Sequence, residues 1–428
     1  MNAGLPEIPE PFVQAVRNLL LKHPQGASPY RLPLSVNTFG ELEIAAALEA
    51  LVRGPMTMGP RVREFETRFA ASLGRAHAVF CNSGSSANLL AFTALTRGAG
   101  PHGRPLLERG DEVIVPAVTW ATTVWPIAQV GAVPVLADVS PDTLNLTVES
   151  VERAFSPRTR AVFVAHTLGN PAPLDELSAL CARRGVVLLE DVCEALDAEI
   201  SGCKAGTAGR LATFSFYFSH HISTIEGGMI VCSKDEDADH LRVLRAHGWT
   251  RQMSEGRRRE AERAHPHIDP RFLFVDVGYN LRGTDVQAAI GLVQLARRGP
   301  FVERRRQVAA AWSLAVQRHD RLFAPVRFAP GASPFAFPIV VRPSARVERR
   351  RVVEFLETEG IETRPLVAGN LARQPALALV PHRVSGPLPG ADLLHERAIY
   401  VGIHPLLTDH QIATLPEALD VLAREVQP

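Results

Sequence analysis

The chain has 428 residues, of which 46% are hydrophobic, and its 46 Lys and Arg nearly cancel its 45 Asp and Glu. This length and apolar content predict one large folded domain plus a smaller one, and they exclude a chain that is disordered throughout. The balanced charge gives no electrostatic case for nucleic acid or an anionic membrane as the main partner.

Regular elements begin after an N-terminal segment, residues 1–35, to which we assign no role. Helical spacing predicts helices over residues 39–51 and 61–73. Short apolar runs bounded by turn residues follow, and helix-like segments such as residues 86–96 and 174–184 separate most of them. This alternation is typical of a mainly parallel α/β sheet that is buried on both faces. We predict seven strands, over residues 76–81, 112–116, 133–138, 161–165, 186–190, 213–218 and 229–232.

The pattern changes after about residue 295. One long helix over residues 302–319, a strand over 335–341 and a helix over 347–359 indicate a smaller α+β domain. We therefore divide the chain into a large domain, residues 36–295, and a small C-terminal domain, residues 296–428. Within the large domain, residues 251–268 form a basic insertion, which we interpret as a solvated loop. A lid or a loop that contacts a nucleotide is the alternative.

Residues 81–88 follow an apolar strand and open a helix. Small residues allow the backbone to approach an anion closely, and the start of a helix offers free N–H groups to it. Gly84 and Ser85 are therefore candidates for binding a phosphate, with a plain strand-to-helix turn as the alternative.

Residues 187–191 form a buried strand that ends in two carboxylates, Glu190 and Asp191. An acid at such a position is often a helix cap. In an α/β sheet, however, ligands lie at the carboxyl ends of the strands. A carboxylate there can pair with a protonated pyridine nitrogen, which makes a pyridoxal ring an electron sink. Glu194 follows one short turn later and faces the same way.

Residues 213–229 contain a strand, a polar turn with adjacent histidines, and a second strand that follows Gly227 and Gly228. Ser215 is placed to donate to a phosphate. On extended backbone His220 and His221 point apart, so at most one of them faces the site. No third ligand has suitable spacing, and we predict no metal site.

These segments, in this order, resemble the DegT/DnrJ/EryC1/StrS family of nucleotide-sugar aminotransferases over about residues 35–425. Further matching blocks lie at residues 56–60, 110–120, 169–171 and 278–282. The resemblance implies the fold type I architecture, pyridoxal 5'-phosphate as cofactor and an obligate homodimer. It also implies roles for matching positions: phosphate binding by Gly84, Ser85 and Ser215, pairing of Asp191 with the pyridine nitrogen, stacking of Trp120 on the ring, proximity of Glu194 to the phenolic oxygen, and contact of Asn280 with the phosphate bound by the partner subunit.

His220 departs from the family pattern, because ordinary members have at this position the lysine that anchors the cofactor. Residues 219–228 and 245–251 resemble the lysine-less branch of sugar 3-dehydratases, in particular those that act on a GDP-linked 4-keto-6-deoxymannose in colitose biosynthesis. A second lysine-less branch carries a [2Fe–2S] cluster. Its cysteine cluster is absent here, since the five cysteines include no Cys-x-x-Cys pair, and we expect no iron–sulfur cluster.

The resemblance implies a reaction in which L-glutamate converts the cofactor to pyridoxamine 5'-phosphate and His220 is the base. Because imidazole titrates near neutrality, His220 is expected to remove a proton and to protonate the C3 hydroxyl as it leaves. The products are a 4-keto-3-deoxy sugar and ammonia. We assign substrate binding to Arg282 and His221, with a surface ion pair and a structural role as the respective alternatives. Two other functions stay open: a sugar aminotransferase that uses another lysine, such as Lys204, and a noncatalytic protein that binds pyridoxal phosphate.

The compartment follows from weaker signals. The odd number of cysteines and the absence of a secretory leader at the N-terminus indicate a reducing environment. No run of about 18 apolar residues is long enough to span a membrane. We therefore expect a cytoplasmic protein.

Overall fold

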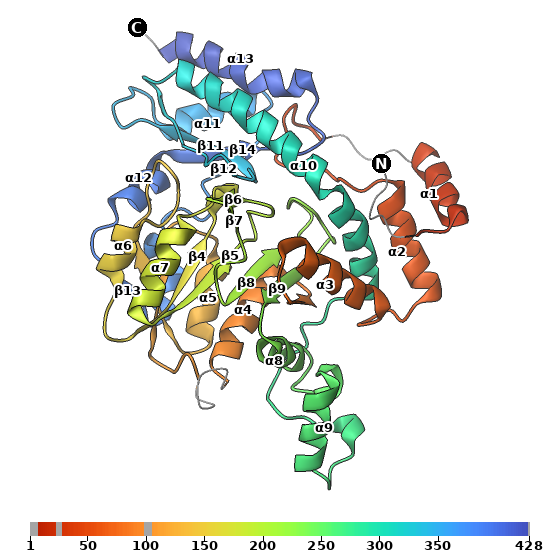
Figure 1. The fold of residues 1–428 in the computed structure, drawn as a ribbon. Helices are drawn as coiled ribbons and strands as arrows, with labels where there is room; N and C mark the ends of the chain where they lie inside the picture. Colours follow the sequence, from red (N-terminus) through yellow and green to blue (C-terminus); the bar gives the residue numbers. More distant parts are fainter. Residues whose placement is uncertain (1–6, 23–27, 98–104, 427–428) are drawn as a thin grey trace.

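The computed structural model describes residues 7–22, 28–97 and 105–426, and a sheet of eight strands lies at its centre (Figure 1). The strands are β1 (His77–Cys81), β2 (Glu112–Pro116), β3 (Val133–Ala137), β4 (Thr159–Ala165), β5 (Val187–Asp191), β8 (Leu211–Ser215), β9 (Gly228–Cys232) and β13 (Arg383–Val384). Their order is β1-β9-β8-β5-β4-β2-β3-β13. All pairings from β8 to β13 are parallel, whereas β9 is antiparallel to both of its neighbours.

All seven predicted strands are therefore present, and the mainly parallel α/β sheet is confirmed. The additional strand, β13, comes from the C-terminal part of the chain and has only two residues. A segment this short has no apolar run to predict it, and it is a strand only because it pairs with β3.

Apolar clusters lie on both faces of this sheet, which explains why its strands are apolar throughout. On one face, Phe80 of β1 and Phe214 of β8 pack with Phe65 and Phe69. Val79, the neighbour of Phe80, belongs to the cluster on the opposite face. The helices that precede, connect or follow these strands are α2 (Glu41–Arg53), α3 (Pro60–Leu73), α4 (Gly84–Leu95), α5 (Ala121–Gln129), α6 (Val148–Ala154), α7 (Leu174–Arg184) and α8 (Asp235–Arg245). A small hairpin is formed by β6 (Glu199–Ile200) and β7 (Cys203–Lys204).

A second, antiparallel sheet of four strands has its own core around the fully buried Trp312. Its strands are β10 (Phe323–Ala324), β11 (Ala336–Val341), β12 (Thr363–Pro365) and β14 (Ala398–Gly402), and the nearby helices are α11 (Arg349–Thr358), α12 (Pro389–Arg397) and α13 (Asp409–Val426). The predicted strand over 335–341 and helix over 347–359 correspond to β11 and α11.

The longest helix, α10 (Asp285–Arg318), joins the two cores (Figure 1). Leu292 packs in a cluster on the central sheet, whereas Trp312 packs in the cluster of the small sheet. The prediction that this helix begins at residue 302 is wrong by about five turns. Pro300 suggests a helix break in the sequence, but here it lies inside a helix that packs on both sides. The division of the chain at residue 295 remains our proposal.

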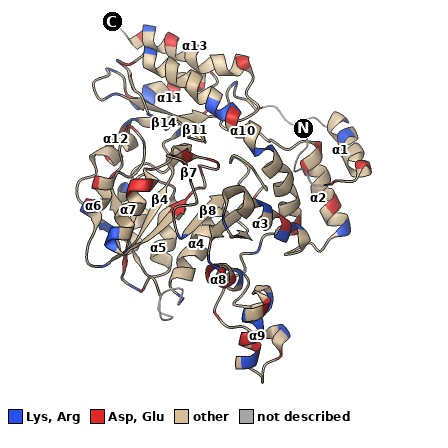
Figure 2. Cartoon of the chain, in the orientation of Figure 1, with Lys and Arg blue, Asp and Glu red and all other residues tan. Residues whose placement is uncertain are grey.

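The basic insertion is not a plain loop, because it contains the helix α9 (Glu255–Ala264), which projects from the body of the protein (Figure 1). None of its residues is buried. Both signs of charge occur along it (Figure 2). The insertion is therefore solvated, as predicted, and its helical form comes from closely spaced residues of high helix propensity. At the N-terminus, α1 (Glu10–Lys22) packs on α2 through Val13 and Val16.

A buried ion pair fastens the start of the sheet to two helices. Arg245, at the end of α8, is 1% exposed and donates to Glu66 Oε1 of α3 (2.6 Å) and to the carbonyl oxygen of Phe80 in β1 (2.5 Å). The same carboxylate accepts from the Phe80 N–H group (2.8 Å). One pair of side chains thus fixes β1 just before the turn at residues 81–88.

We expect Arg245→Met to lower the free energy of unfolding by about 3–5 kcal/mol, because it leaves the Glu66 carboxylate buried without a counter-charge. Urea unfolding measures this. The double variant Glu66→Leu with Arg245→Met should recover most of the loss, since no buried charge remains. A cost below about 1 kcal/mol for the single variant would contradict this account of the pair.

Candidate active site

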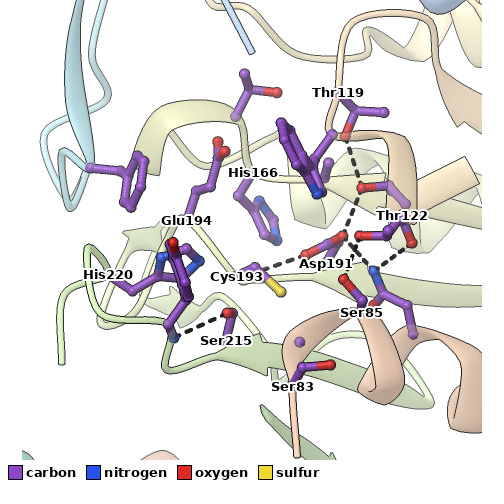
Figure 3. A pocket seen from close by; sticks show the side chains of 18 of the residues that line it. Ser83, Ser85, Thr119, Thr122, His166, Asp191, Cys193, Glu194, Ser215 and His220 are labelled. Carbon is purple, nitrogen blue, oxygen red and sulfur yellow. Dashed lines mark hydrogen bonds between the residues drawn. The ribbon is translucent and has the colours of Figure 1, made fainter. Parts of the chain in front are cut away.

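A cavity of about 390 Å³ opens where the parallel strands end (Figure 3). Ligands of open α/β sheets bind at this edge, and the volume suits a cofactor-sized molecule. Seven of the ten residues that the sequence nominated line this cavity: Gly84, Ser85, Trp120, Asp191, Glu194, Ser215 and His220.

The turn between β1 and α4 forms one wall. Ser83 caps α4, and its hydroxyl accepts from the Ser86 N–H group (3.1 Å). Gly84, the first residue of the helix, lies against Ser215, so that a Cβ at this position would be 2.5 Å from Ser215 Cβ. Only glycine permits this approach. The helix start, Ser85 and Ser215 therefore converge on one point of the cavity, which is the arrangement that binds a phosphate.

Asp191, at the end of β5, is held by three hydrogen bonds (Figure 3). Its Oδ2 accepts from Asn88 Nδ2 (3.0 Å) and Thr123 Oγ1 (2.9 Å), and its Oδ1 accepts from the Cys193 N–H group (3.1 Å). A carboxylate has about four acceptor positions, so one remains for a donor in the cavity. A protonated pyridine nitrogen is such a donor. The sequence did not assign Asn88 to the site, although it lies one helical turn after Gly84 and on the same side of α4.

Glu190 precedes Asp191 and points to the other side of the strand. It accepts from His166 Nε2 (3.3 Å) and from the N–H groups of Gly206 (2.7 Å) and Gly209 (2.6 Å). Burial opposes ionisation, but these hydrogen bonds outweigh it and lower the pKa of Glu190. His166 Nδ1 accepts from the Ala172 N–H group, which leaves the proton on Nε2. Of the two carboxylates, Glu190 thus fixes the His166 ring in the cavity wall, and only Asp191 faces the cavity.

Glu194 is half-buried in the cavity wall, and this burial raises its pKa to about 7. The Leu168 N–H group, which donates to Glu194 Oε2 (2.7 Å), opposes the shift, and the negative charge of Asp191 adds to it. Tyr400, from the small sheet, lines the same cavity, and burial raises its pKa to about 12. Near neutral pH the Glu194 carboxyl therefore exists in both forms and can donate or accept a proton.

His220 is held by aromatic contacts rather than by hydrogen bonds to its ring. Its imidazole lies edge-on to Phe335 (centroids 5.0 Å apart, 77°) and to Tyr217 (6.1 Å, 89°). Its Nδ1 is buried and has no partner among the described residues. Burial, with the positive charge of Arg305, lowers the pKa of His220 to about 3. The expectation that this imidazole titrates near neutrality is thus wrong. It is neutral at physiological pH and available as a proton acceptor.

Three nominated residues do not line the cavity. His221 points the other way, and its Nε2 donates to the Ser333 carbonyl oxygen (2.9 Å) inside the protein. This placement favours the structural role that was the alternative for His221. Asn280 is exposed and accepts from Arg282 Nε (2.8 Å) outside the cavity of its own chain.

The sequence did not nominate several residues of the cavity walls. Phe335 lies just before β11 and Tyr400 lies in β14, more than 100 residues after the other site residues, and no local pattern in the sequence indicates that they line a site. Thr119 and Thr123 lie beside Trp120 and support Asp191 from behind, with Thr119 Oγ1 donating to Thr123 Oγ1 (3.0 Å). Trp120 itself is 57% exposed at the cavity mouth, which leaves its ring free to stack on a ligand.

In the part of the chain that the structure describes, no group of three or more His, Cys, Asp or Glu is arranged to hold a metal ion. All five cysteines are unpaired. Among the same residues no helix is both long enough and apolar enough to cross a membrane.

Comparison with known proteins agrees with the motifs. The model of the DegT/DnrJ/EryC1/StrS aminotransferase family matches residues 37–420. GDP-4-keto-6-deoxy-D-mannose 3-dehydratase of Escherichia coli O55:H7 is 36% identical over 389 residues, covering 90% of this chain and 99% of the relative. dTDP-4-dehydro-2,6-dideoxy-D-glucose 3-dehydratase of Saccharopolyspora spinosa is 36% identical over 404 residues, covering 92% and 86%. A crystal structure of GDP-4-keto-6-deoxymannose-3-dehydratase with a trapped PLP-glutamate geminal diamine superposes with a TM-score of 0.84 at 34% identity, covering 91% and 100%. The predicted resemblance to the lysine-less 3-dehydratases is confirmed.

The lowered pKa of His220 makes stability depend on pH. Between the folded value of about 3 and the ordinary value of 6.5, the unfolded chain binds a proton that the folded chain does not. The contribution of the neutral ring is therefore complete above pH 6.5 and is lost as the pH falls. We expect His220→Asn to flatten the fall in unfolding free energy between about pH 6 and pH 4, by up to about 1.4 kcal/mol per pH unit. Denaturant unfolding at several pH values measures it, with the exposed His382→Asn as control. Parallel curves for the wild type and His220→Asn would contradict the lowered pKa.

Proposed function

The chain belongs to the DegT/DnrJ/EryC1/StrS aminotransferase family, and from this membership we propose that it is a dehydratase that depends on pyridoxal 5'-phosphate. Its substrate in this proposal is a nucleotide-linked 4-keto-6-deoxy sugar, which loses the C3 hydroxyl. The observation that carries the proposal is His220 in the cavity, together with the absence of lysine among the described residues that line it. Two relatives named as sugar 3-dehydratases, each 36% identical, support it.

The aminotransferase alternative would need a lysine in the cavity. Lys204 lies in β7, and its Nζ donates to the Ser72 carbonyl oxygen (3.3 Å). It is not one of the cavity residues. This placement favours the dehydratase.

The cavity fits the cofactor. The start of α4 with Gly84 and Ser85, together with Ser215, would hold the phosphate, and the remaining acceptor position of Asp191 would hold the pyridine N–H group. The exposed ring of Trp120 is free to stack on the pyridine face. Bound there, pyridoxal phosphate supplies an electron sink and a carrier for the amino group.

The chemistry of the protein then centres on His220. Its neutral imidazole accepts one proton and returns it to the C3 hydroxyl oxygen, which leaves as water. A lysine at this position would instead protonate the sugar carbon and yield an amino sugar. With the cofactor bound, Glu194, whose pKa is about 7, would share a proton with the phenolic oxygen, and Asp191 would keep the pyridine nitrogen protonated.

L-Glutamate is the amino donor in this proposal. The neighbour structure that contains a PLP-glutamate geminal diamine supports it. Glutamate gives its amino group and two electrons to the site and leaves as 2-oxoglutarate. The electrons reduce the sugar as the hydroxyl departs, and the amino group is released as ammonia. In the overall reaction, the 4-keto-6-deoxy sugar and glutamate give the 3-deoxy sugar, 2-oxoglutarate and ammonia.

GDP is the nucleotide we propose, because residues 219–228 and 245–251 resemble the GDP-sugar enzymes. The relative that acts on a dTDP sugar is equally identical overall, so dTDP is the competing nucleotide. The assay should therefore test both the GDP-linked and the dTDP-linked sugar. The free cysteines fit a reducing compartment, and the cytoplasm is the proposed location.

A homodimer completes the proposal. The segment before Asn280 exposes an apolar face, in which Trp249 lies between Phe272 and Phe274 (centroids 5.9 and 6.0 Å away) and Val277 is 79% exposed. An exposed face of this kind usually marks a contact with another protein. If it packs against a second copy, Asn280 can reach the partner's phosphate.

Purified protein incubated with pyridoxal phosphate, glutamate and GDP-4-keto-6-deoxymannose should release ammonia and a sugar without the 3-hydroxyl. Mass spectrometry of the sugar and an ammonia assay measure this, with the dTDP-linked sugar in parallel. A stable 4-amino sugar would refute the dehydratase and support the aminotransferase. No turnover with either nucleotide would favour the noncatalytic alternative.

His220→Lys should abolish dehydration, because the lysine binds the cofactor covalently and returns the proton to carbon. The absorbance of the bound cofactor should shift to that of a lysine-linked form. Lys204→Met is the matched control and should keep both dehydration and the absorbance of the wild type. Dehydration that survives in His220→Lys would exclude His220 as the base.

A further inference from the structure

A buried arginine with no ion-pair partner among the described residues is linked to the His220 ring through Phe335. Arg305 of α10 is 2% exposed. Its guanidinium donates only to main-chain carbonyl oxygens, those of Phe335 (2.8 Å), Pro334 (3.5 Å) and Ile403. Burial lowers the pKa of Arg305 to about 9, and no described carboxylate opposes the shift. The group therefore remains charged at neutral pH.

Such an arrangement is costly, because a buried charge that lacks a partner of opposite sign loses much of its favourable hydration. Three carbonyl dipoles recover part of this. An apolar side chain in the same place would lose no such hydration and would need no carbonyl dipoles around it. The charge itself is thus the feature that needs an explanation.

The positive charge of Arg305 acts on three histidines: His220, His221 and His404. The charge of Arg305 adds to burial in lowering the pKa of each of them. Nδ1 of His220 and of His221, and both ring nitrogens of His404, have no hydrogen-bond partner among the described residues. None of these ring nitrogens therefore has a described partner that would stabilise a protonated ring.

The other titratable groups of the cavity do not reverse this effect at His220. Asp191 is bonded to its three donors, and Glu194 accepts from Leu168. Neither carboxyl group forms a hydrogen bond or an ion pair with the His220 ring. Among the described residues, Arg305 is the one charge that shifts the pKa of His220. The remaining titratable side chains around the cavity are Cys193 on the segment after β5, His166 after β4, Tyr217 and Glu226 on the loops beside His220, and Tyr400 on β14.

We propose that Arg305 is a positioning residue whose buried positive charge opposes a positive charge on His220 and whose hydrogen bond to Phe335 sets the orientation of the His220 ring. The second effect follows from the hydrogen bond to the Phe335 carbonyl oxygen, since the Phe335 ring meets His220 edge-on. Many catalytic histidines are held by a carboxylate, which stabilises the protonated ring. Arg305 carries a positive charge instead, which destabilises the protonated ring.

This sign suits the reaction, and here the inference rests on the proposed function. A base that must pass its proton to a leaving hydroxyl needs a protonated form that is acidic enough to give that proton up, and a fixed cation supplies this acidity at some cost in basicity. Beside a fixed cation, the imidazolium of His220 is a stronger acid than it would be in water. The proton is therefore released to the C3 oxygen rather than retained.

The test is the pKa of His220 in the protein without cofactor, measured by NMR on histidine labelled with ¹³C at Cε1. The His220 signal is identified by its loss in His220→Asn. In the wild type it should stay neutral over the whole pH range in which the protein is folded. Arg305→Gln, which keeps a donor for the carbonyl oxygens but has no charge, should raise the pKa by about one unit or more. Arg305→Lys, which keeps the charge, should resemble the wild type.

Arg306→Gln is the matched control. Arg306 is the next residue on α10 and also donates to carbonyl oxygens, those of Ala332 and Asp197, but it does not shift the pKa of His220. An unchanged pKa in Arg305→Gln, or a shift of equal size in Arg306→Gln, would overturn the proposal. If Arg305→Gln does not fold, the pKa of His220 is measured in Arg305→Met and in the wild type. A wild-type His220 pKa at or above 6.5 also overturns the proposal.

The dehydratase assay separates this inference from the proposed function. If the enzyme is active but the pKa of His220 is the same in the wild type and in Arg305→Gln, only the role of Arg305 is refuted. A pKa that responds to Arg305 in a protein without dehydratase activity refutes only the proposed reaction.

Discussion

Strands β5 and β8 lie side by side and parallel, with Asp191 paired to Thr213, and the candidate site depends on this pairing. Since side chains alternate along a strand, Ser215 projects on the same side as Thr213, two residues earlier, and reaches the edge where Asp191 ends β5. Gly84 then brings the start of α4 against Ser215. A carboxylate, a hydroxyl and a helix N-terminus thus meet at one edge of the sheet, although they are far apart in the chain.

The two ends of the cavity have opposite electrostatic character. At one end, Asp191 is surrounded by donors that hold its carboxylate in place. At the other end, the His220 ring makes no hydrogen bond with the described residues and meets the rings of Tyr217 and Phe335 edge-on, and the positive charge of Arg305 adds to burial in lowering its pKa. A cofactor ring between them would meet a fixed negative charge at its nitrogen and a neutral base at its reactive side. This polarity favours withdrawal of electrons into the ring and a short stay of the proton on the base.

Family membership explains the scaffold, and one position explains the departure from it. The motifs at residues 81–88, 187–191 and 213–229 serve the aminotransferases of the family equally well, because binding a phosphate and a pyridine ring does not depend on how the cofactor is attached. The small sheet contributes what surrounds position 220. Phe335 and the carbonyl oxygens that hold Arg305 come from this part of the chain, so both sheets shape the environment of the base.

The sequence alone determined the α/β sheet with its seven principal strands, the family, and seven residues of the cavity. Apolar runs and short motifs are local features of the chain, so they can be recognised without knowledge of the fold. It misjudged the start of α10, since Pro300 suggests a break that packing on two cores overrides. It also misjudged the titration of His220 and assigned a binding role to His221, although it correctly expected the two histidines to point apart with at most one facing the site. The titration of His220 and the placement of His221 depend on burial and on Arg305, Phe335 and Ser333, all more than 80 residues away in the chain. Only the tertiary structure decided them, because the protonation state of a side chain is set by its neighbours in space.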